Sequence, residues 1–336
     1  MTRRLRLVLV MTRPAVAWLF AVYAAIGVAS AGHGEDRWLI LRALVVVLGF
    51  LMFSAACNDI ADERIDAINL AGDRRKPLMS GLGNRVEVLV IGLTGAALAI
   101  GFAAWLGWPV LLTLLAGLVL SLGYSVPPVR VADRGALASL LLPACYVAVP
   151  FLVGHLAAAR HLGPSGFLIL AGLYITFIGR ILLKDFRDVR GDALFGKRTF
   201  LVRHGRGPTC VASTICLVLG SVVLLLGVPQ PSIVLITGYA GGAIAATVAL
   251  VVLRNDPGPR RDEAVISTIA IIGRGMLILL FLHQETQAAD WPALRYDAIM
   301  AALIVVIALQ AHAMWRRGPI SRLTVPVVTE PAESAR

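Results

Sequence analysis

Two short acidic stretches organise the chain. Residues 58–66 read NDIADERID, and residues 184–192 read KDFRDVRGD. Each stretch carries three aspartates at relative positions 0, 3 and 7. On a helix that advances about 100° per residue, these positions fall within an arc of roughly 60°, so each trio predicts one acidic stripe. The six residues are Asp59, Asp62, Asp66, Asp185, Asp188 and Asp192.

Each stripe begins where a long apolar run ends. The 336 residues are 58% hydrophobic and only 15% charged, which is too apolar for a soluble globular protein and predicts a polytopic membrane protein. Helices are expected in the spans, because backbone groups in lipid must be paired within their own segment. The candidate spans lie near 15–31, 38–57, 86–106, 109–124, 135–158, 166–184, 209–228, 231–253, 264–283 and 296–315. We therefore predict an all-α transmembrane bundle of nine to ten spans, with internal duplication of an aspartate-bearing helical unit.

Two of these spans leave alternatives open. The first run ends in Ala29-Ser30-Ala31, which resembles a signal-peptide cleavage site, but the hydrophobic segments that follow favour an uncleaved span. The run 264–283 is interrupted by Gly273-Arg274-Gly275, so the tenth span depends on whether this run crosses the membrane. We expect a single transmembrane domain over residues 1–320 and a short polar tail over 321–336.

The basic residues indicate which side of the membrane each loop faces. The net charge of +11 could suggest a nucleic-acid partner, but most Lys and Arg residues sit in short loops between apolar runs. The loops of one side contain only Arg37, Arg160 and Arg295, whereas those of the other side are rich in basic residues and contain both stripes. This asymmetry predicts a multi-pass cell-membrane protein with both stripes and both termini in the cytoplasm. The partner is then the lipid bilayer, and no nucleic acid is expected.

The stripes predict a metal-dependent chemistry. Six carboxylates in one cavity would repel each other unless a cation neutralised them. Carboxylates flanked by Lys and Arg suit Mg²⁺ shared with a diphosphate. Lys184 opens the second stripe, and Arg180 lies one turn earlier on the same face, so both are expected to hold phosphate oxygens. At the end of an apolar cavity, such a site would bind a diphosphate with a hydrocarbon tail and promote its ionisation. The alternative, that the stripes are solvated loop charges, is disfavoured because the trio occurs twice at equivalent positions.

With these motifs, the sequence resembles the UbiA superfamily of intramembrane prenyltransferases from the first stripe to about Gly205. The family signature Asn-Asp-x-x-Asp-x-x-x-Asp is present at 58–66, and a second signature is present at 185–192. Residues 124–130, YSVPPVR, resemble the tyrosine-proline loop of chlorophyll synthase-like members. The resemblance implies that Asn58 and the six aspartates bind Mg²⁺, and that Asn58, Lys76, Tyr124 and Arg130 contact the diphosphate. Arg134 is the alternative to Arg130 for the basic residue of this loop.

We therefore predict a Mg²⁺-dependent prenyltransferase, in which the six aspartates are catalytic. It ionises a prenyl diphosphate and transfers the prenyl group to a lipophilic or aromatic acceptor; the resemblance favours a small aromatic acceptor. One alternative is a terpene cyclase of the same superfamily, which acts on the prenyl diphosphate alone. Sparse aromatic residues, 7% of the chain, favour the transferase. A more remote alternative is a non-catalytic carrier of isoprenoid phosphates, for which two metal-binding trios would not be needed.

Overall fold

The computed structural model of the chain describes residues 2–69, 76–186, 199–255 and 258–319. Two of the predicted metal ligands, Asp188 and Asp192, lie outside the described residues, as does the predicted tail 321–336. Over the described ranges the fold is all helical, with no strand.

The described helices fall into two halves of the chain. The first half contains α1 (Arg3–Met11), α2 (Pro14–Ser30), α3 (Arg37–Ala61), α4 (Glu63–Asn69), α5 (Arg85–Leu106), α6 (Trp108–Ser125), the 3₁₀ turn η1 (Val131–Asp133), α7 (Ala136–Pro143), the π-helical turn η2 (Ala144–Ala148) and α8 (Val149–Ala158). The second half contains α9 (Pro164–Leu182), α11 (Phe200–His204), α12 (Arg206–Gly227), α13 (Ile233–Arg254), α14 (Pro259–Ala288) and α15 (Ala293–Arg317).

The number of spans agrees with the prediction. Within the described ranges, nine helical segments are long and apolar enough to cross a membrane. A tenth is obtained if α1 and α2, which meet at a bend of 52°, form one broken span. The run with Gly273-Arg274-Gly275 does not break, because α14 is continuous over 30 residues. Gly275 is needed there for packing: a Cβ at this position would lie 2.5 Å from side-chain carbons of Ile307 on α15.

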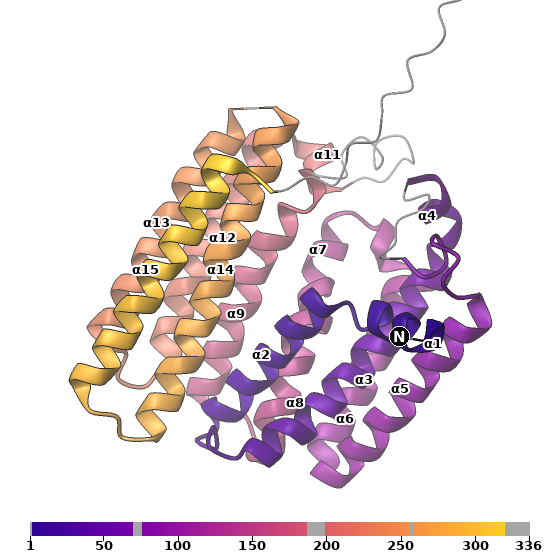
Figure 1. The fold of residues 1–336 in the computed structure, drawn as a ribbon, viewed down its shortest axis with the longest axis horizontal. Coiled ribbons are helices and arrows are strands. Elements are labelled where there is room, and N and C mark those ends of the chain that lie inside the picture. Colours follow the sequence, from indigo (N-terminus) through magenta and orange to yellow (C-terminus); the bar gives the residue numbers. More distant parts are fainter. Residues whose placement is uncertain (1, 70–75, 187–198, 256–257, 320–336) are drawn as a thin grey trace, which may run out of the picture.

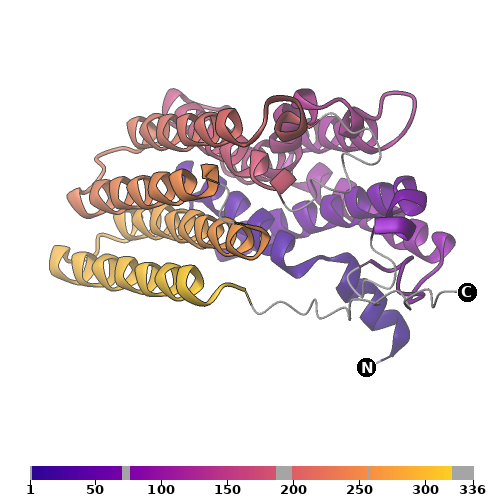
Figure 2. The same cartoon turned by 90° about the horizontal axis from the view of Figure 1, so that it is seen from above.

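The two largest apolar cores of the described bundle are joined through the same two helices, α2 and α8. One core lies among α2, α3, α5, α6 and α8, and the other among α2, α8, α9 and α12–α15. Neighbouring residues of α2 face opposite cores: Phe20 belongs to the first and Leu19 to the second. Figures 1 and 2 show the two groups of helices side by side along the long axis of the molecule.

The two aspartate-bearing spans pack in the same way. α3 is paired with α5, and α9 with α12. An added Cβ on Gly49 would lie 2.3 Å from the carbonyl oxygen of Gly95, and one on Gly172 would lie 2.6 Å from that of Gly220. Small residues thus allow the backbones of both pairs to approach closely, as is common where helices pack in membranes. The predicted acidic stretch follows the first helix of each pair.

Both acidic stretches therefore start at one end of the bundle. This end, called the aspartate end below, also carries α4, α11 and the turn between α13 and α14 (Figure 1). The opposite end carries the short loops after α2, α8 and α14, which contain or adjoin the three basic residues predicted to be external.

Candidate functional site

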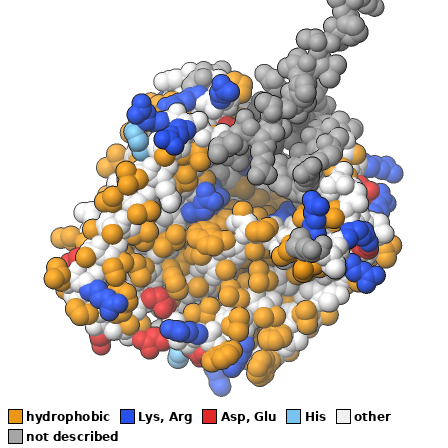
Figure 3. Space-filling view, viewed as in Figure 1, with side chains coloured by type: hydrophobic (Ala, Val, Ile, Leu, Met, Phe, Trp, Pro, Cys, Tyr) orange, Lys and Arg blue, Asp and Glu red, His pale blue; other side chains and the backbone are white. Residues whose placement is uncertain are grey.

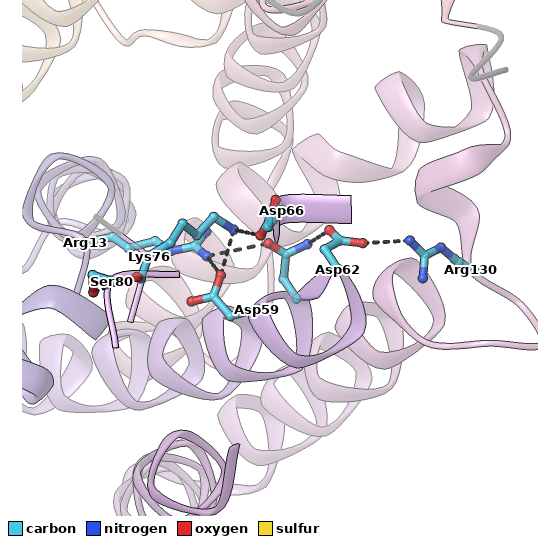
Figure 4. Close-up of polar contacts among 8 residues, drawn as sticks. Arg13, Asp59, Asp62, Asp66, Lys76, Ser80 and Arg130 are labelled. Atoms are coloured by element: carbon cyan, nitrogen blue, oxygen red, sulfur yellow. Dashed lines mark hydrogen bonds and ion pairs between the residues drawn. The ribbon is translucent and has the colours of Figure 1, made fainter. Parts of the chain in front are cut away.

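The first acidic stretch straddles a break between two helices. Asp59 lies in the last turn of α3, Asp62 is the residue between α3 and α4, and Asp66 is on α4. The sequence predicted one uninterrupted stripe, but α3 ends at Ala61, and Asp62 has φ −95° and ψ 3°. Because of this break, Asp62 points away from Asp59 and Asp66 in Figure 4.

Lys76 joins the other two aspartates. Its Nζ atom lies 2.7 Å from Oδ1 of Asp59 and 2.8 Å from Oδ2 of Asp66 (Figure 4). The backbone of Lys76 is held in a turn, because Ser80 donates from its amide and its hydroxyl to the Lys76 carbonyl oxygen. An ammonium group, which donates in several directions, can satisfy both carboxylates at once. The lysine predicted to contact phosphate therefore lies between two of the predicted metal ligands.

Arg13 is a site residue that the sequence analysis missed. It is the residue before α2, has φ 46°, and donates from Nη2 to Oδ1 of Asp59 at 2.5 Å. It also lies 3.5 Å from Oδ1 of Asn58. In the sequence, a basic residue before the first span indicates only topology. The bend between α1 and α2 directs it inward, and a bend cannot be recognised from residue types alone.

Asp62 has a cation of its own. Arg130 donates to Oδ1 of Asp62 at 2.7 Å and to the carbonyl oxygen of Ala61 at 3.3 Å. Asn58 donates to the other carboxylate oxygen of Asp62 at 2.7 Å. Of the two arginines considered for this loop, Arg130 reaches the aspartates, while Arg134 is exposed. The loop after α6 thus closes on the first acidic stretch.

One carboxylate oxygen at this site has no partner. Asp59 exposes only 3% of its surface, and its Oδ2 atom is buried without a hydrogen bond to any described group. A buried, unpaired carboxylate oxygen is costly, and a hard cation such as Mg²⁺ would satisfy it. No three acidic, His or Cys side chains of the described ranges converge closely enough to hold a metal ion. Lys76 and Arg130 hold the aspartates of the first trio, and two of the second trio lie outside the described ranges.

Tyr124 and the start of the second stretch lie at the same end of the bundle. Tyr124 is half-buried in the last turn of α6, and Lys184 and Asp185 follow α9. Lys184 is exposed. Arg180 lies one turn deeper in α9, with its Cζ atom 5.9 Å from the centre of the Phe177 ring. The predicted residues on α6 and after α9 therefore lie at the same end of the bundle as the first stretch.

Below the charged groups, aromatic rings pack together. Tyr146, on the π-helical turn, lies 5.4 Å from Phe20 and 5.6 Å from Phe177 between ring centres. Phe50 and Tyr23 extend the cluster at 6.0 Å and 6.5 Å. The low aromatic content favours a transferase over a cyclase, but these five rings lie together in the bundle core. Four of the five expose 5% of their surface or less.

Two proteins of similar sequence match much of the chain. A bacteriochlorophyll synthase 34 kDa chain from Chloroflexus aurantiacus is 27% identical over 255 residues, which cover 75% of this chain and 77% of that protein. Homogentisate phytyltransferase 1 from Arabidopsis thaliana is 28% identical over 217 residues, 58% of this chain; the match spans 51% of the length of that relative.

The fold is also found among solved structures. A UbiA homologue from Archaeoglobus fulgidus, bound to DMAPP and Mg²⁺, superposes with a TM-score of 0.55. The two chains are 14% identical, and the match covers 94% of this chain and all of that one. The sequence model of the UbiA prenyltransferase family matches residues 17–272, from α2 into α14. The chain therefore belongs to the UbiA prenyltransferase family.

Proposed function

We propose that this membrane-embedded prenyltransferase transfers the prenyl group of an allylic prenyl diphosphate to an aromatic acceptor in a Mg²⁺-dependent reaction. The observation that carries the proposal is the Oδ2 atom of Asp59, which is buried and has no hydrogen-bond partner among the described residues, while Arg13 and Lys76 bind the other oxygen and Arg130 binds the nearby Asp62. Such a site combines an unfilled ligand for a divalent cation with donors for a diphosphate.

Asp59, Asp62 and Asp66, with Asn58, would hold Mg²⁺ on the side of α3. Asp185, Asp188 and Asp192 would do so after α9. When bound, Mg²⁺ neutralises the diphosphate leaving group and so favours ionisation of the allylic C–O bond.

The cationic side chains of the site can also bind the diphosphate. Arg13, Lys76 and Arg130 balance the charge of the three aspartates in this structure. The same N–H groups can donate to phosphate oxygens, with arginine acting as a planar fork and lysine as a point charge. We infer that these three residues orient the diphosphate and stabilise its growing negative charge. Arg180 and Lys184 would do so from α9 and the residues after it.

Two features support an acceptor-using reaction. Tyr124 in the last turn of α6 and Arg130 in the loop that follows lie at the edge of the site, where a second substrate could enter beside the head group. The relative from Arabidopsis is named a homogentisate phytyltransferase, and another, from Humulus lupulus, a 2-acylphloroglucinol 4-prenyltransferase. Both names give aromatic acceptors, which supports an aromatic acceptor here.

The experiment uses the purified full chain with geranylgeranyl diphosphate and Mg²⁺, with and without a panel of aromatic acceptors. We expect pyrophosphate release to rise when the right acceptor is added, and mass spectrometry to detect a prenylated product. Efficient conversion to a cyclic hydrocarbon without any gain from acceptors would replace the transferase by a cyclase. Binding of the diphosphate without pyrophosphate release under every condition would indicate a carrier.

The site is proposed to face the cytoplasm. The basic residues of the loops support this orientation, since the aspartate end carries most of them.

A further inference from the structure

An apolar cavity lies among α13, α14 and α15, away from the aspartates. Its volume is about 460 Å³. The lining positions run from Thr237 to Val248 on α13 and from Ile304 to Trp315 on α15, with α14 as the floor. Twelve helical residues span about 16 Å, roughly the thickness of one membrane leaflet's hydrocarbon layer. α15 lies beyond the part of the chain that matches the family model, so this cavity has a wall outside that match.

The glycines of α13 show which part of the cavity is free. A Cβ on Gly238 would lie 3.1 Å from Ile304, and one on Gly242 would lie 3.0 Å from Met276, so these two already serve packing within the chain. A Cβ on Gly241 would meet no atom within 4 Å. The apolar lining and the length of about 16 Å suit a single hydrocarbon chain.

A basic rim lies where the three helices reach the aspartate end. It consists of Arg254, Arg260, Arg261, Arg316 and Arg317, and Figure 3 shows blue side chains at this upper end above an orange face. Within the described ranges, the four exposed arginines of the rim form no ion pair, and the acidic Asp262 is neutralised by Arg206 at 2.6 Å.

One residue connects the rim to the cavity. The guanidinium of Arg261 stacks 4.2 Å from the ring centre of Trp315, which lines the cavity, and also donates to the Trp315 carbonyl oxygen. A tryptophan at the edge of an apolar groove, next to arginines, is typical of the level of lipid head groups. Basic residues at this level attract anionic lipids.

We propose that this cavity and rim form a binding site for one anionic phospholipid. One acyl chain lies in the cavity along Gly241, and the phosphate group meets the arginines of the rim. A second copy of this chain is disfavoured as the occupant, because two of the three glycines of α13 that line the cavity, Gly238 and Gly242, already pack against α14 and α15, and only Gly241 is free.

The test measures lipid binding to the purified full chain in detergent by native mass spectrometry. The probes are phosphatidylglycerol and phosphatidylcholine with the same acyl chains. We expect at least tenfold preference for phosphatidylglycerol. In Arg260→Gln/Arg316→Gln the preference should fall at least fivefold, whereas Arg295→Gln, at the other end of the bundle, should keep it.

A cavity-filling substitution tests the acyl chain separately. Gly241→Phe should weaken binding of both lipids at least fivefold, since the added ring occupies the free part of the cavity. Its matched control is Gly101→Phe, an exposed position on α5 where a Cβ also meets open space. Equal affinity for the two lipids in the unmodified chain, or unchanged binding in Gly241→Phe, would overturn the proposal. So would a dimer in light scattering that Gly241→Phe converts to a monomer, because the occupant would then be a second copy.

Discussion

Asp59→Asn is the sharpest perturbation of the proposed site. The change keeps the size and shape of a side chain that is 97% buried, but removes its negative charge. Oδ1 of Asp59 accepts from Arg13 at 2.5 Å and from Lys76 at 2.7 Å, and its Oδ2 is the proposed metal ligand. A single substitution therefore weakens two charge-assisted hydrogen bonds and removes a hard oxygen donor.

The two losses differ in size and can be measured separately. An amide oxygen still accepts hydrogen bonds, and Lys76 keeps its pair with Asp66, so we expect the free energy of unfolding to fall by only about 1–3 kcal/mol. Turnover depends on the lost metal ligand. We expect kcat/KM to fall at least a hundredfold, which corresponds to about 2.7 kcal/mol of transition-state stabilisation.

The assay is pyrophosphate release from geranylgeranyl diphosphate, with an acceptor identified beforehand, over a range of Mg²⁺ concentrations. Size-exclusion chromatography before and after heating reports the fraction that stays folded. Asp133→Asn is the matched control: its carboxylate also pairs with a site cation, Arg130 at 2.6 Å, but is 45% exposed. We expect the control to remain within a few-fold of the unmodified chain. Activity of Asp59→Asn within tenfold of the unmodified chain, with the same Mg²⁺ dependence, would contradict the assignment of Asp59 as a metal ligand.

Three further predictions follow from the same geometry. Arg130→Gln should lower kcat/KM at least tenfold, because it removes the cation paired with Asp62, whereas Arg134→Gln, at an exposed position, should change kcat/KM less than threefold. Equal effects of the two substitutions in the kinetic assay would exclude a special role for Arg130. Gly275→Leu should destabilise the packing of α14 on α15 by about 2 kcal/mol or more, whereas Gly273→Leu, which points into open space, should be tolerated; melting curves in detergent distinguish the two. Single cysteines introduced near Arg37, Arg160 and Arg295, which are predicted to be external, should react with an impermeant thiol reagent in intact cells, and those beside the aspartates should not. The reverse labelling pattern would show that the predicted topology is inverted.

The bundle could be predicted from the sequence because the rules that govern it are local. Each span is an uninterrupted apolar run of about membrane thickness, and its boundaries are marked by charge. The structure places a helix at every predicted run. Even the doubtful run around Arg274 follows a local rule: its glycines do not end the helix, because a membrane helix keeps its backbone hydrogen bonds and uses small residues for packing. The same rules did not predict α1 as a helix, since Arg3–Met11 is charged and short.

Much of the site could be named in advance, but its pairing could not. Asn58, the aspartates of the first trio, Lys76 and Arg130 are all part of one charge network in the structure. Which cation meets which carboxylate depends on the break at Asp62, which directs that residue to the loop after α6 and leaves Asp59 and Asp66 to Lys76. Residue spacing assumes an ideal helix and does not show at which residue that helix ends.

Arg13 shows how such a network exceeds what spacing can reveal. Its charge was visible, but charge before a span is common to many membrane proteins and serves orientation alone in most of them. It becomes a site residue because the bend after α1 turns the residue before Pro14 back toward α3, 46 positions away in sequence. One oxygen of the buried Asp59 carboxylate accepts from two cations, Arg13 and Lys76. The other oxygen has no hydrogen-bond partner among the described residues. The proposed Mg²⁺ ligand is therefore the oxygen without a partner, and the N–H groups proposed to donate to the diphosphate are those of Arg13 and Lys76, which share the other oxygen.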